Sequence, residues 1–166
     1  MLTLHTKIPH ADQIAARLVL PYELREKCRL RATLDSGEEV AVFTVRGTVL
    51  RDGDLLTGAD RRVIQVVAAP EPTYKIMCDD PQALLRCAFH LGNRHTQAQV
   101  GVGFLRIRAD KVLKEMLSGL GASVAEQMAA FEPESGAYGG GHAHHHDGPL
   151  APIPLRQKIH RPGDAT

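Results

Sequence analysis

Four histidines lie within five positions near the end of the 166-residue chain, at His142, His144, His145 and His146. Neutral imidazole is a good ligand for nickel, copper and zinc. Several imidazoles on one flexible stretch can surround an ion without a preformed cage, and such a site releases its ion readily. Because the run is interrupted and internal, metal binding is favoured over a purification tag or a polar linker. The run does not identify the metal, since most nitrogen and oxygen sites prefer copper to nickel or zinc.

Two further histidines flank a predicted helix end, His90 in its last turn and His95 just beyond Gly92-Asn93. His90 is explained by contacts to helix carbonyls and the helix dipole. His95 lies in a turn, where it is either a ligand or a surface residue. If two chains paired about a two-fold axis here, two His95 side chains would meet on one ion. Three isolated histidines are interpreted as surface residues: His5, His10 and His160.

Residues 1–71 show strand patterns and turn signals. Arg29–Leu34 alternates apolar and polar side chains, and a hairpin signal leads from it to a return strand at Val40–Val45. Val63–Val67 is an apolar run of strand length. No helical period is visible, so we predict an all-β domain of sandwich or barrel type.

Residues 72–132 alternate between strand and helix patterns. Asp80 and Asp110 are predicted to cap two helices. The strands are predicted at Thr73–Cys78, Thr96–Val102, Phe104–Arg108 and Ser123–Phe131. This β-α-β-β-α-β order is that of the ferredoxin-like arrangement, so the fold class is α+β. Pro70 and Pro72 mark the boundary before it, since proline disfavours a central strand.

Residues 133–166 are rich in glycine and proline, and we expect a flexible tail in the absence of metal or a partner. The charges balance, with 20 Lys plus Arg against 19 Asp plus Glu, which argues against nucleic acid or an anionic membrane as partner. No apolar stretch of membrane-spanning length and no secretion signal is visible, so a cytoplasmic location is expected. Cys28, Cys78 and Cys87 lack metal-site spacing and are interpreted as small buried hydrophobes.

Three segments resemble the urease accessory protein E family of nickel metallochaperones. Phe89–His95 resembles the family's hallmark turn, Leu50–Leu56 its N-terminal turn, and Phe131–Tyr138 the approach to its histidine-rich tail. The resemblance implies an N-terminal domain similar to the peptide-binding domain of Hsp40 chaperones. It also implies a ferredoxin-like C-terminal domain through which two chains form a homodimer.

The same resemblance implies the metal site and the partners. His95 of each subunit would bind one Ni²⁺ at the dimer interface, assisted by tail histidines among His142, His144, His145 and His146; zinc or copper would compete for these ligands. The implied partners are the urease apoprotein and the urease accessory proteins, including the accessory GTPase. Where some members carry histidines beside Asp110, this chain has Ala109 and Lys111. We therefore expect no peripheral site there.

The sequence thus predicts a nickel metallochaperone rather than an enzyme. The competing hypothesis is a peptide-binding scaffold of a maturation complex whose tail buffers metal. A metalloenzyme is disfavoured because a hydrolytic zinc site needs about three fixed ligands and a base, and no HExxH or comparable set is present. An RNA-binding domain would need stacking aromatics on its central strands, and Phe104 is the only candidate.

Overall fold

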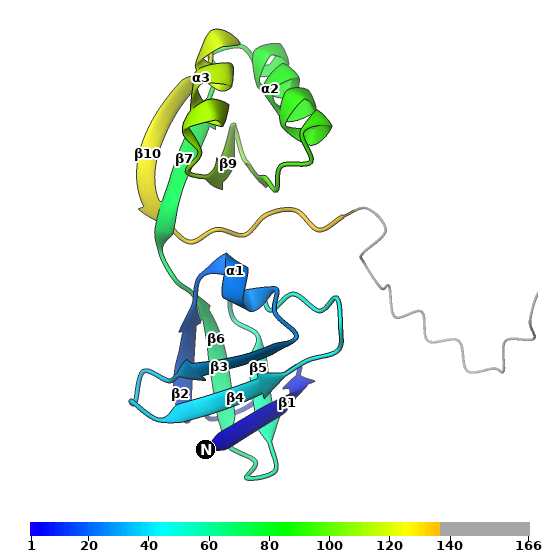
Figure 1. The fold of residues 1–166 in the computed structure, drawn as a ribbon, viewed down its shortest axis with the longest axis vertical. Coiled ribbons are helices and arrows are strands. Elements are labelled where there is room, and N and C mark those ends of the chain that lie inside the picture. Colours follow the sequence, from blue (N-terminus) through cyan, green and yellow to red (C-terminus); the bar gives the residue numbers. More distant parts are fainter. Residues whose placement is uncertain (137–166) are drawn as a thin grey trace, which may run out of the picture. The chain divides into compact units, whose positions relative to one another are not determined.

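The structure, a computed structural model, describes residues 1–136. Its N-terminal half contains one mixed six-stranded sheet, ordered β2-β6-β5-β1-β4-β3 (Figure 1). The strands are β1 (Leu2–Ile8), β2 (Ala16–Leu20), β3 (Arg29–Thr33), β4 (Glu39–Phe43), β5 (Leu55–Gly58) and β6 (Val63–Ala68). β1 pairs with β4, and β2 with β6, in parallel; the other pairs are antiparallel.

The six-stranded sheet is nearly closed. Asp35, just beyond β3, donates its backbone N–H to the Arg17 carbonyl of β2 over 3.0 Å, and the Arg17 N–H donates to Asp35 Oδ1 over 2.9 Å. These bonds bring the two outer strands together. The observed form is therefore barrel-like, and no second sheet packs against this one among the described residues.

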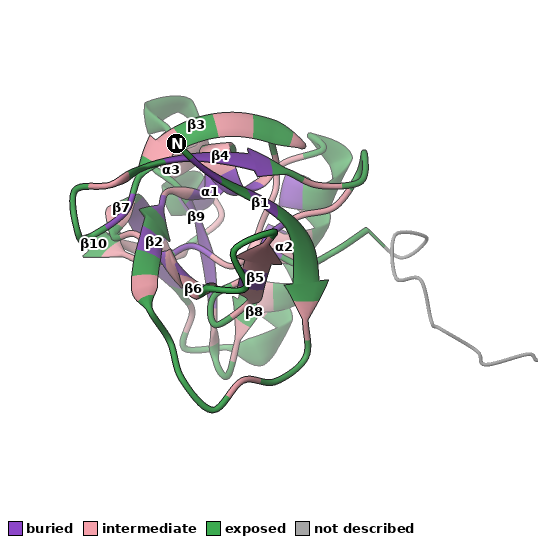
Figure 2. Cartoon of the chain, turned by 90° about the horizontal axis from the view of Figure 1, so that it is seen from below, coloured by how far each residue is buried: buried purple, intermediate pink, exposed green. Residues whose placement is uncertain are grey.

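Alternation along the strands builds the interior of this sheet (Figure 2). In β6, Ile64, Val66 and Ala68 are buried while the residues between them are half-exposed. Leu2 and Leu4 do the same in β1. Because successive side chains of a strand point to opposite faces, this pattern places one apolar face of each strand inside.

The prediction that this half is entirely β is wrong at one turn. Residues Tyr22–Arg25 form the short helix α1, directly after Pro21. A helix of four residues is too short for a helical period to appear in the sequence. Tyr22 and Arg25 are both buried, and their roles are described below.

The second half alternates as predicted. Its elements are β7 (Glu71–Met77), α2 (Pro81–Asn93), β8 (Gln99–Gly101), β9 (Phe104–Arg108), α3 (Lys111–Gly119) and β10 (Ser123–Ala129). The four strands form an antiparallel sheet ordered β10-β7-β9-β8. The prediction of a mixed α+β chain is confirmed.

Both helices begin at the predicted caps. Asp80 accepts hydrogen bonds from the N–H groups of Gln82 and Ala83, and Asp110 accepts one from Leu113. These bonds satisfy helix N–H groups that have no partner within the helix. The apolar faces of α2 and α3 then pack on the sheet around Ile76, Leu105 and Ile107.

Two local predictions need correction. Pro72 lies inside β7, an interior strand of the sheet, although proline was expected to exclude a central strand. The pairing of β7 with β9 begins only at Thr73, so Pro72 lies near the end of the strand, where its missing N–H is tolerated. The strand expected at Thr96–Val102 is limited to Gln99–Gly101. The residues before it close helix α2 and contact a later segment instead.

The predicted tail, residues 133–166, lies outside the described residues except for its first four positions. Of these, Pro133 is buried and the Glu134 N–H donates to the Ala98 carbonyl over 2.9 Å. Within residues 1–136, neither the length nor the apolarity of any helix suffices to cross a membrane.

Candidate metal centre

His95 directly follows Arg94, the C-cap residue of helix α2 (Pro81–Asn93). The helix closes with two reverse hydrogen bonds, from the Thr96 N–H to the Leu91 carbonyl at 3.1 Å and from the His95 N–H to the Gly92 carbonyl at 2.9 Å. This pair of bonds defines a Schellman motif, in which the residue at the position of His95 adopts a left-handed conformation. His95 accordingly has φ +53°.

A left-handed residue at a helix end is usually glycine, because a Cβ atom makes that conformation costly. Only one other described non-glycine residue has positive φ, Arg61 at +61°. Residues held in a sparsely populated backbone conformation are concentrated at functional sites. The chain thus keeps an imidazole where the backbone alone would favour glycine.

The His95 side chain is exposed, and within residues 1–136 its ring makes no hydrogen bond or ion pair. It borders a shallow hollow of about 660 Å³ that is also lined by Glu71, Arg108 and Asp110. Both carboxylates are engaged by backbone groups: Glu71 accepts from the Tyr22 N–H over 2.8 Å and Asp110 from the Leu113 N–H over 2.9 Å. The His95 imidazole, which has no such partner among the described residues, is the candidate metal ligand of this hollow.

His90 lies one turn earlier on α2 and is half-buried. Its ring packs edge-to-face against Phe89, with ring centroids 5.5 Å apart. This packing accounts for His90 without a metal, so His90 is a weaker candidate than His95.

The described residues alone do not complete a metal site. No three His, Cys, Asp or Glu side chains within residues 1–136 come close enough to hold one ion. The tail candidates, His142, His144, His145 and His146, lie outside the described residues, as does His160. His5 and His10 are exposed. A site at His95 must therefore draw ligands from the tail or from a second chain.

An exposed apolar face lies on helix α2, which precedes His95. Leu85 and Phe89 are separated by one helical turn on α2 and remain 71% and 65% exposed. Residues four apart lie on the same side of a helix. We call the face formed by Leu85 and Phe89 the α2 apolar face; it lies on the helix that ends at the turn carrying His95.

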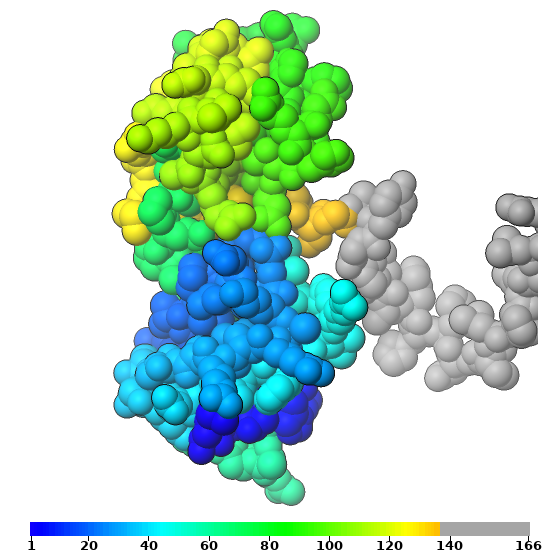
Figure 3. Space-filling model, viewed as in Figure 1, coloured from blue at the N-terminus to red at the C-terminus, as the bar shows by residue number. Residues whose placement is uncertain are grey.

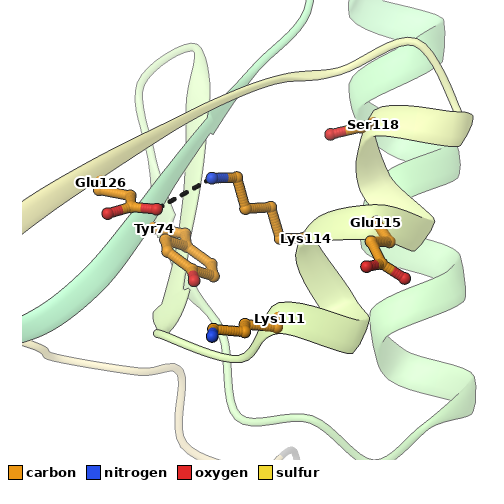
Figure 4. A pocket seen from close by; sticks show the side chains of 6 residues that line it. All are labelled: Tyr74, Lys111, Lys114, Glu115, Ser118 and Glu126. Atoms are coloured by element: carbon orange, nitrogen blue, oxygen red, sulfur yellow. Dashed lines mark hydrogen bonds and ion pairs between the residues drawn. The ribbon is translucent and has the colours of Figure 1, made fainter.

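A second hollow, of about 490 Å³, lies between α3 and strands β7 and β10 (Figure 4). Lys114 crosses it, donating to Glu126 over 2.9 Å and lying 5.6 Å from the centre of the Tyr74 ring. The hydrogen bond lowers the pKa of Glu126 and raises that of Lys114. No histidine or cysteine lines this hollow, so we do not regard it as a metal site.

The cysteines do not form a thiolate site. Cys87 lies on the buried side of helix α2, fully enclosed in the core, and Cys78 packs at the edge of that core. Burial, together with the neighbouring Cys78, raises the pKa of the Cys87 thiol to about 11. The raised pKa disfavours the thiolate form that binds a metal. The interpretation of Cys87 as a small buried hydrophobe agrees with this placement, whereas Cys28 and Cys78 are only half-buried.

Arg25 is a residue whose importance the sequence did not reveal. Its side chain is fully buried and pairs with the carboxylate of Glu132, 107 positions later in the chain. The pairing with Glu132 distinguishes Arg25 from the other arginines, and no local sequence pattern predicts this pairing. The nearest signal is that Glu132 belongs to one of the family-like segments.

Comparison with known proteins decides the family. Residues 2–69 match the N-terminal domain, and residues 71–161 the C-terminal domain, of the UreE urease accessory protein. The chain belongs to this family. It is 71% identical to the urease accessory protein UreE of Janthinobacterium sp. (strain Marseille), covering 99% of this chain and 98% of that protein. The corresponding protein of Nitrosospira multiformis is 66% identical over the same shares.

More distant relatives keep the same name. The urease accessory protein UreE of Cupriavidus necator is 51% identical over 89% of this chain and 77% of its own length. The resemblance inferred from the three sequence segments is thus confirmed. Membership makes the chain an accessory protein that serves urease maturation, in a family distinct from the catalytic urease itself.

Proposed function

We propose that this chain is a nickel metallochaperone: as a homodimer it binds Ni²⁺ through His95 and tail histidines and delivers the ion to apo-urease. The observation that carries the proposal is the exposed imidazole of His95, held in a left-handed conformation at a helix end. The family relation supports nickel as the cargo, since these relatives are named for their role with urease.

Dimerisation is supported by the α2 apolar face. Two large apolar side chains that remain about two-thirds exposed on one helix are costly to leave in water, at roughly 25 cal/mol per Å². Pairing this face with its copy would bury Leu85 and Phe89. If the two helices pair in parallel, it would also bring the two copies of the His95 turn to the same end of the interface, because the turn follows the same helix.

Access of the tail is supported by the backbone near His95. The Glu134 N–H bonds to the Ala98 carbonyl, three residues after His95, so at most about 11 Å of backbone separates this bond from that histidine. Eight residues of chain lead from Glu134 to His142, and eight residues span at most about 28 Å when fully extended. His142, His144, His145 and His146 therefore have the reach to join His95 on one ion.

The remaining assignments follow from this role. The proposed partners are the urease apoprotein and its accessory proteins, including the accessory GTPase, and the proposed location is the cytoplasm. We propose three regions: residues 1–71 as a partner-binding β domain, residues 72–132 as a ferredoxin-like dimerisation and metal domain, and residues 133–166 as the histidine-bearing tail. Zinc and copper would compete with nickel for the same imidazoles.

A nickel titration by calorimetry, combined with mass measurement of the loaded species, tests the proposal. The full chain is expected to take one tightly bound nickel per two chains. His95→Ala is expected to lose that site, whereas His90→Ala, one turn away, keeps it. Tight binding of unchanged stoichiometry in His95→Ala would remove His95 from the mechanism.

A further inference from the structure

The hairpin of strands β3 and β4 turns arginine and aromatic side chains away from the core of the six-stranded sheet. Arg29 on β3 lies directly opposite Phe43 on β4, and Arg31 is the next residue of β3 on the same face. The residues between them, Leu30 and Val42, point inward and pack in the core. Both arginines and Phe43 therefore share the outer face of the hairpin.

This outer face is open to solvent. Strands β3 and β4 cross in front of β5 and β6 in Figure 1, and their blue and cyan atoms are uncovered in the space-filling view (Figure 3). Along β3, exposed residues alternate with half-buried ones (Figure 2). Phe43 is 44% exposed, and Val45, two residues later, is 81% exposed. The hairpin thus presents apolar side chains to water beside its arginines.

The arginines of this region are unpaired. Arg29 and Arg31 are exposed, and neither side chain makes a hydrogen bond, ion pair or ring contact within residues 1–136. The same is true of Arg46, in the turn that follows β4. By contrast, Arg62 elsewhere on this half is ion-paired with two carboxylates. The guanidinium groups near Phe43 are therefore available to bind a partner.

One carboxylate lies on the same outer face. Glu39 begins β4 and is paired with Thr33, in the register that sets Arg29 opposite Phe43. It lies four residues before Phe43, or about 13 Å along the strand. Strands β1, β3 and β4 contain no other acidic residue. The end of the hairpin at Phe43 is therefore cationic.

The spacing of the arginines matches an extended acidic chain. An arginine binds a carboxylate through two parallel hydrogen bonds. Arg29 and Arg31 are two residues apart on one strand, so they repeat at about 6.6 Å, and carboxylates on alternate residues of an extended segment repeat at the same distance. Phe43 adds an apolar contact beside them. Aromatic and arginine side chains are the residues that contribute most to binding at protein interfaces.

We propose that this outer face docks an extended acidic segment of a partner protein. We call it the arginine face, and its residues are Arg29, Arg31, Phe43, Val45 and Arg46. Carboxylates of the segment bind the arginines, and an apolar side chain of the segment packs on Phe43. This inference rests on the proposed function, because it assigns the surface through which the β domain holds a protein of urease maturation.

Charge argues against two other occupants of the arginine face. A second copy of this chain, placed there about a two-fold axis, would set the same arginines against each other, and like charges across an interface repel. Nucleic acid calls for a broad cationic surface, whereas this chain has 20 basic against 19 acidic residues, and Glu39 lies on the same face.

The test measures binding of the full chain to purified urease apoprotein and, separately, to the purified accessory GTPase. Arg31→Glu reverses one charge of the arginine face and is expected to weaken binding of the docked protein about 10-fold in about 0.1 M salt. Phe43→Ala removes the apolar contact and is expected to weaken it about 5-fold.

Arg61→Glu is the matched control, because Arg61 is also exposed and makes no side-chain contact within residues 1–136. Its neighbour Arg62 is bonded to Glu38, which precedes β4. Glu38 lies about 17 Å along the strand from Phe43. The control is therefore expected to leave binding unchanged. Weakening by Arg61→Glu equal to that by Arg31→Glu would overturn the proposal.

Salt separates the charge of Arg31 from structural damage. Raising the salt from about 0.1 M to about 1 M shortens the screening length from about 10 Å to about 3 Å. The difference between Arg31→Glu and the parent chain should therefore narrow, and a difference that stays constant would contradict the proposal. If Arg31→Glu fails to fold, Arg31→Gln replaces it, with a smaller loss expected in the same direction.

Other occupants give other results. Conversion of the dimer to a monomer by Arg31→Glu in sedimentation experiments would assign the arginine face to a second copy of the chain. Binding of a short DNA duplex by the parent chain that is lost in Arg31→Glu would assign it to nucleic acid. Either result would overturn the docking of an acidic protein segment.

Failure of the proposed function is distinguishable from failure of this inference. If the parent chain binds neither protein, the partner role is wrong and the docking surface is wrong with it. If the parent chain binds, and Arg31→Glu and Phe43→Ala bind equally well, only the arginine face is wrong. Nickel stoichiometry should be the same in Arg31→Glu as in the parent chain, and a change would show that the substitution acts on the metal centre instead of on docking.

Discussion

Replacing His95 by glycine is expected to make the protein more stable while destroying its metal site. A left-handed conformation costs an ordinary residue roughly 1–2 kcal/mol, and glycine escapes that cost. Glycine also has more conformational freedom in the unfolded chain, which destabilises the folded state by about 0.5–1 kcal/mol and so offsets part of that gain. The exposed His95 ring makes no described hydrogen bond, so little packing is lost. The expected gain is about 0.5–1 kcal/mol.

His95→Ala provides the matched comparison. Alanine removes the imidazole but keeps a Cβ atom at φ +53°, so it should bring no such gain. At roughly 2–4 °C per kcal/mol for a chain of this size, thermal unfolding should place the glycine variant about 1–4 °C above the alanine variant. Both variants should lose the tight nickel site.

Arg61→Gly controls for the backbone effect alone. Arg61 is also exposed and left-handed, at φ +61°, so the substitution should raise the stability by a similar amount and leave nickel binding intact. Equal melting temperatures for His95→Gly and His95→Ala would refute the argument from backbone strain. Retention of the tight nickel site by His95→Gly would refute the role of the imidazole.

Three further predictions concern other surfaces. Phe89→Glu should convert the dimer to a monomer in sedimentation experiments, because a charge would replace the exposed ring of the α2 apolar face. The control Val112→Glu, on α3, should leave the dimer intact. A dimer that survives Phe89→Glu would exclude the α2 apolar face as the interface. Arg62 lowers the pKa of both Glu38 and Asp60 by hydrogen bonding. The stability that Arg62 contributes through these bonds is therefore present above the ordinary carboxyl pKa values and is lost as the pH falls through the lowered ones. The denaturation midpoints of Arg62→Met and the parent chain should differ at pH 7 and converge near pH 2, and a constant difference would contradict this. Burial raises the pKa of Cys87 to about 11, so at pH 8 a thiol reagent should modify Cys28 and Cys78 before Cys87, which should react only on unfolding.

The sequence was most informative where local chemistry decides structure. Asp80 and Asp110 cap their helices as predicted, because a carboxylate followed by helical residues satisfies N–H groups that lack partners. The alternation in β6 and the apolar faces of α2 and α3 were also predicted from the sequence, because their apolar residues recur at the period of a strand or of a helix. Helix α1 was missed because four residues are too few for a helical period to appear. The short extent of β8 was missed because Ala98, just before it, bonds to the distant Glu134.

For the site, the sequence determined which side chains are capable of binding metal, because imidazole chemistry belongs to the residue and not to the fold. It also located His95 at a helix end, through Gly92-Asn93. Only the tertiary structure showed that His95 is left-handed, that Glu71 and Asp110 are already engaged by backbone groups, and that Arg25 is buried against Glu132. These depend on hydrogen bonds and burial between segments as much as 107 positions apart, and no local pattern of residues encodes which distant partner will be found there.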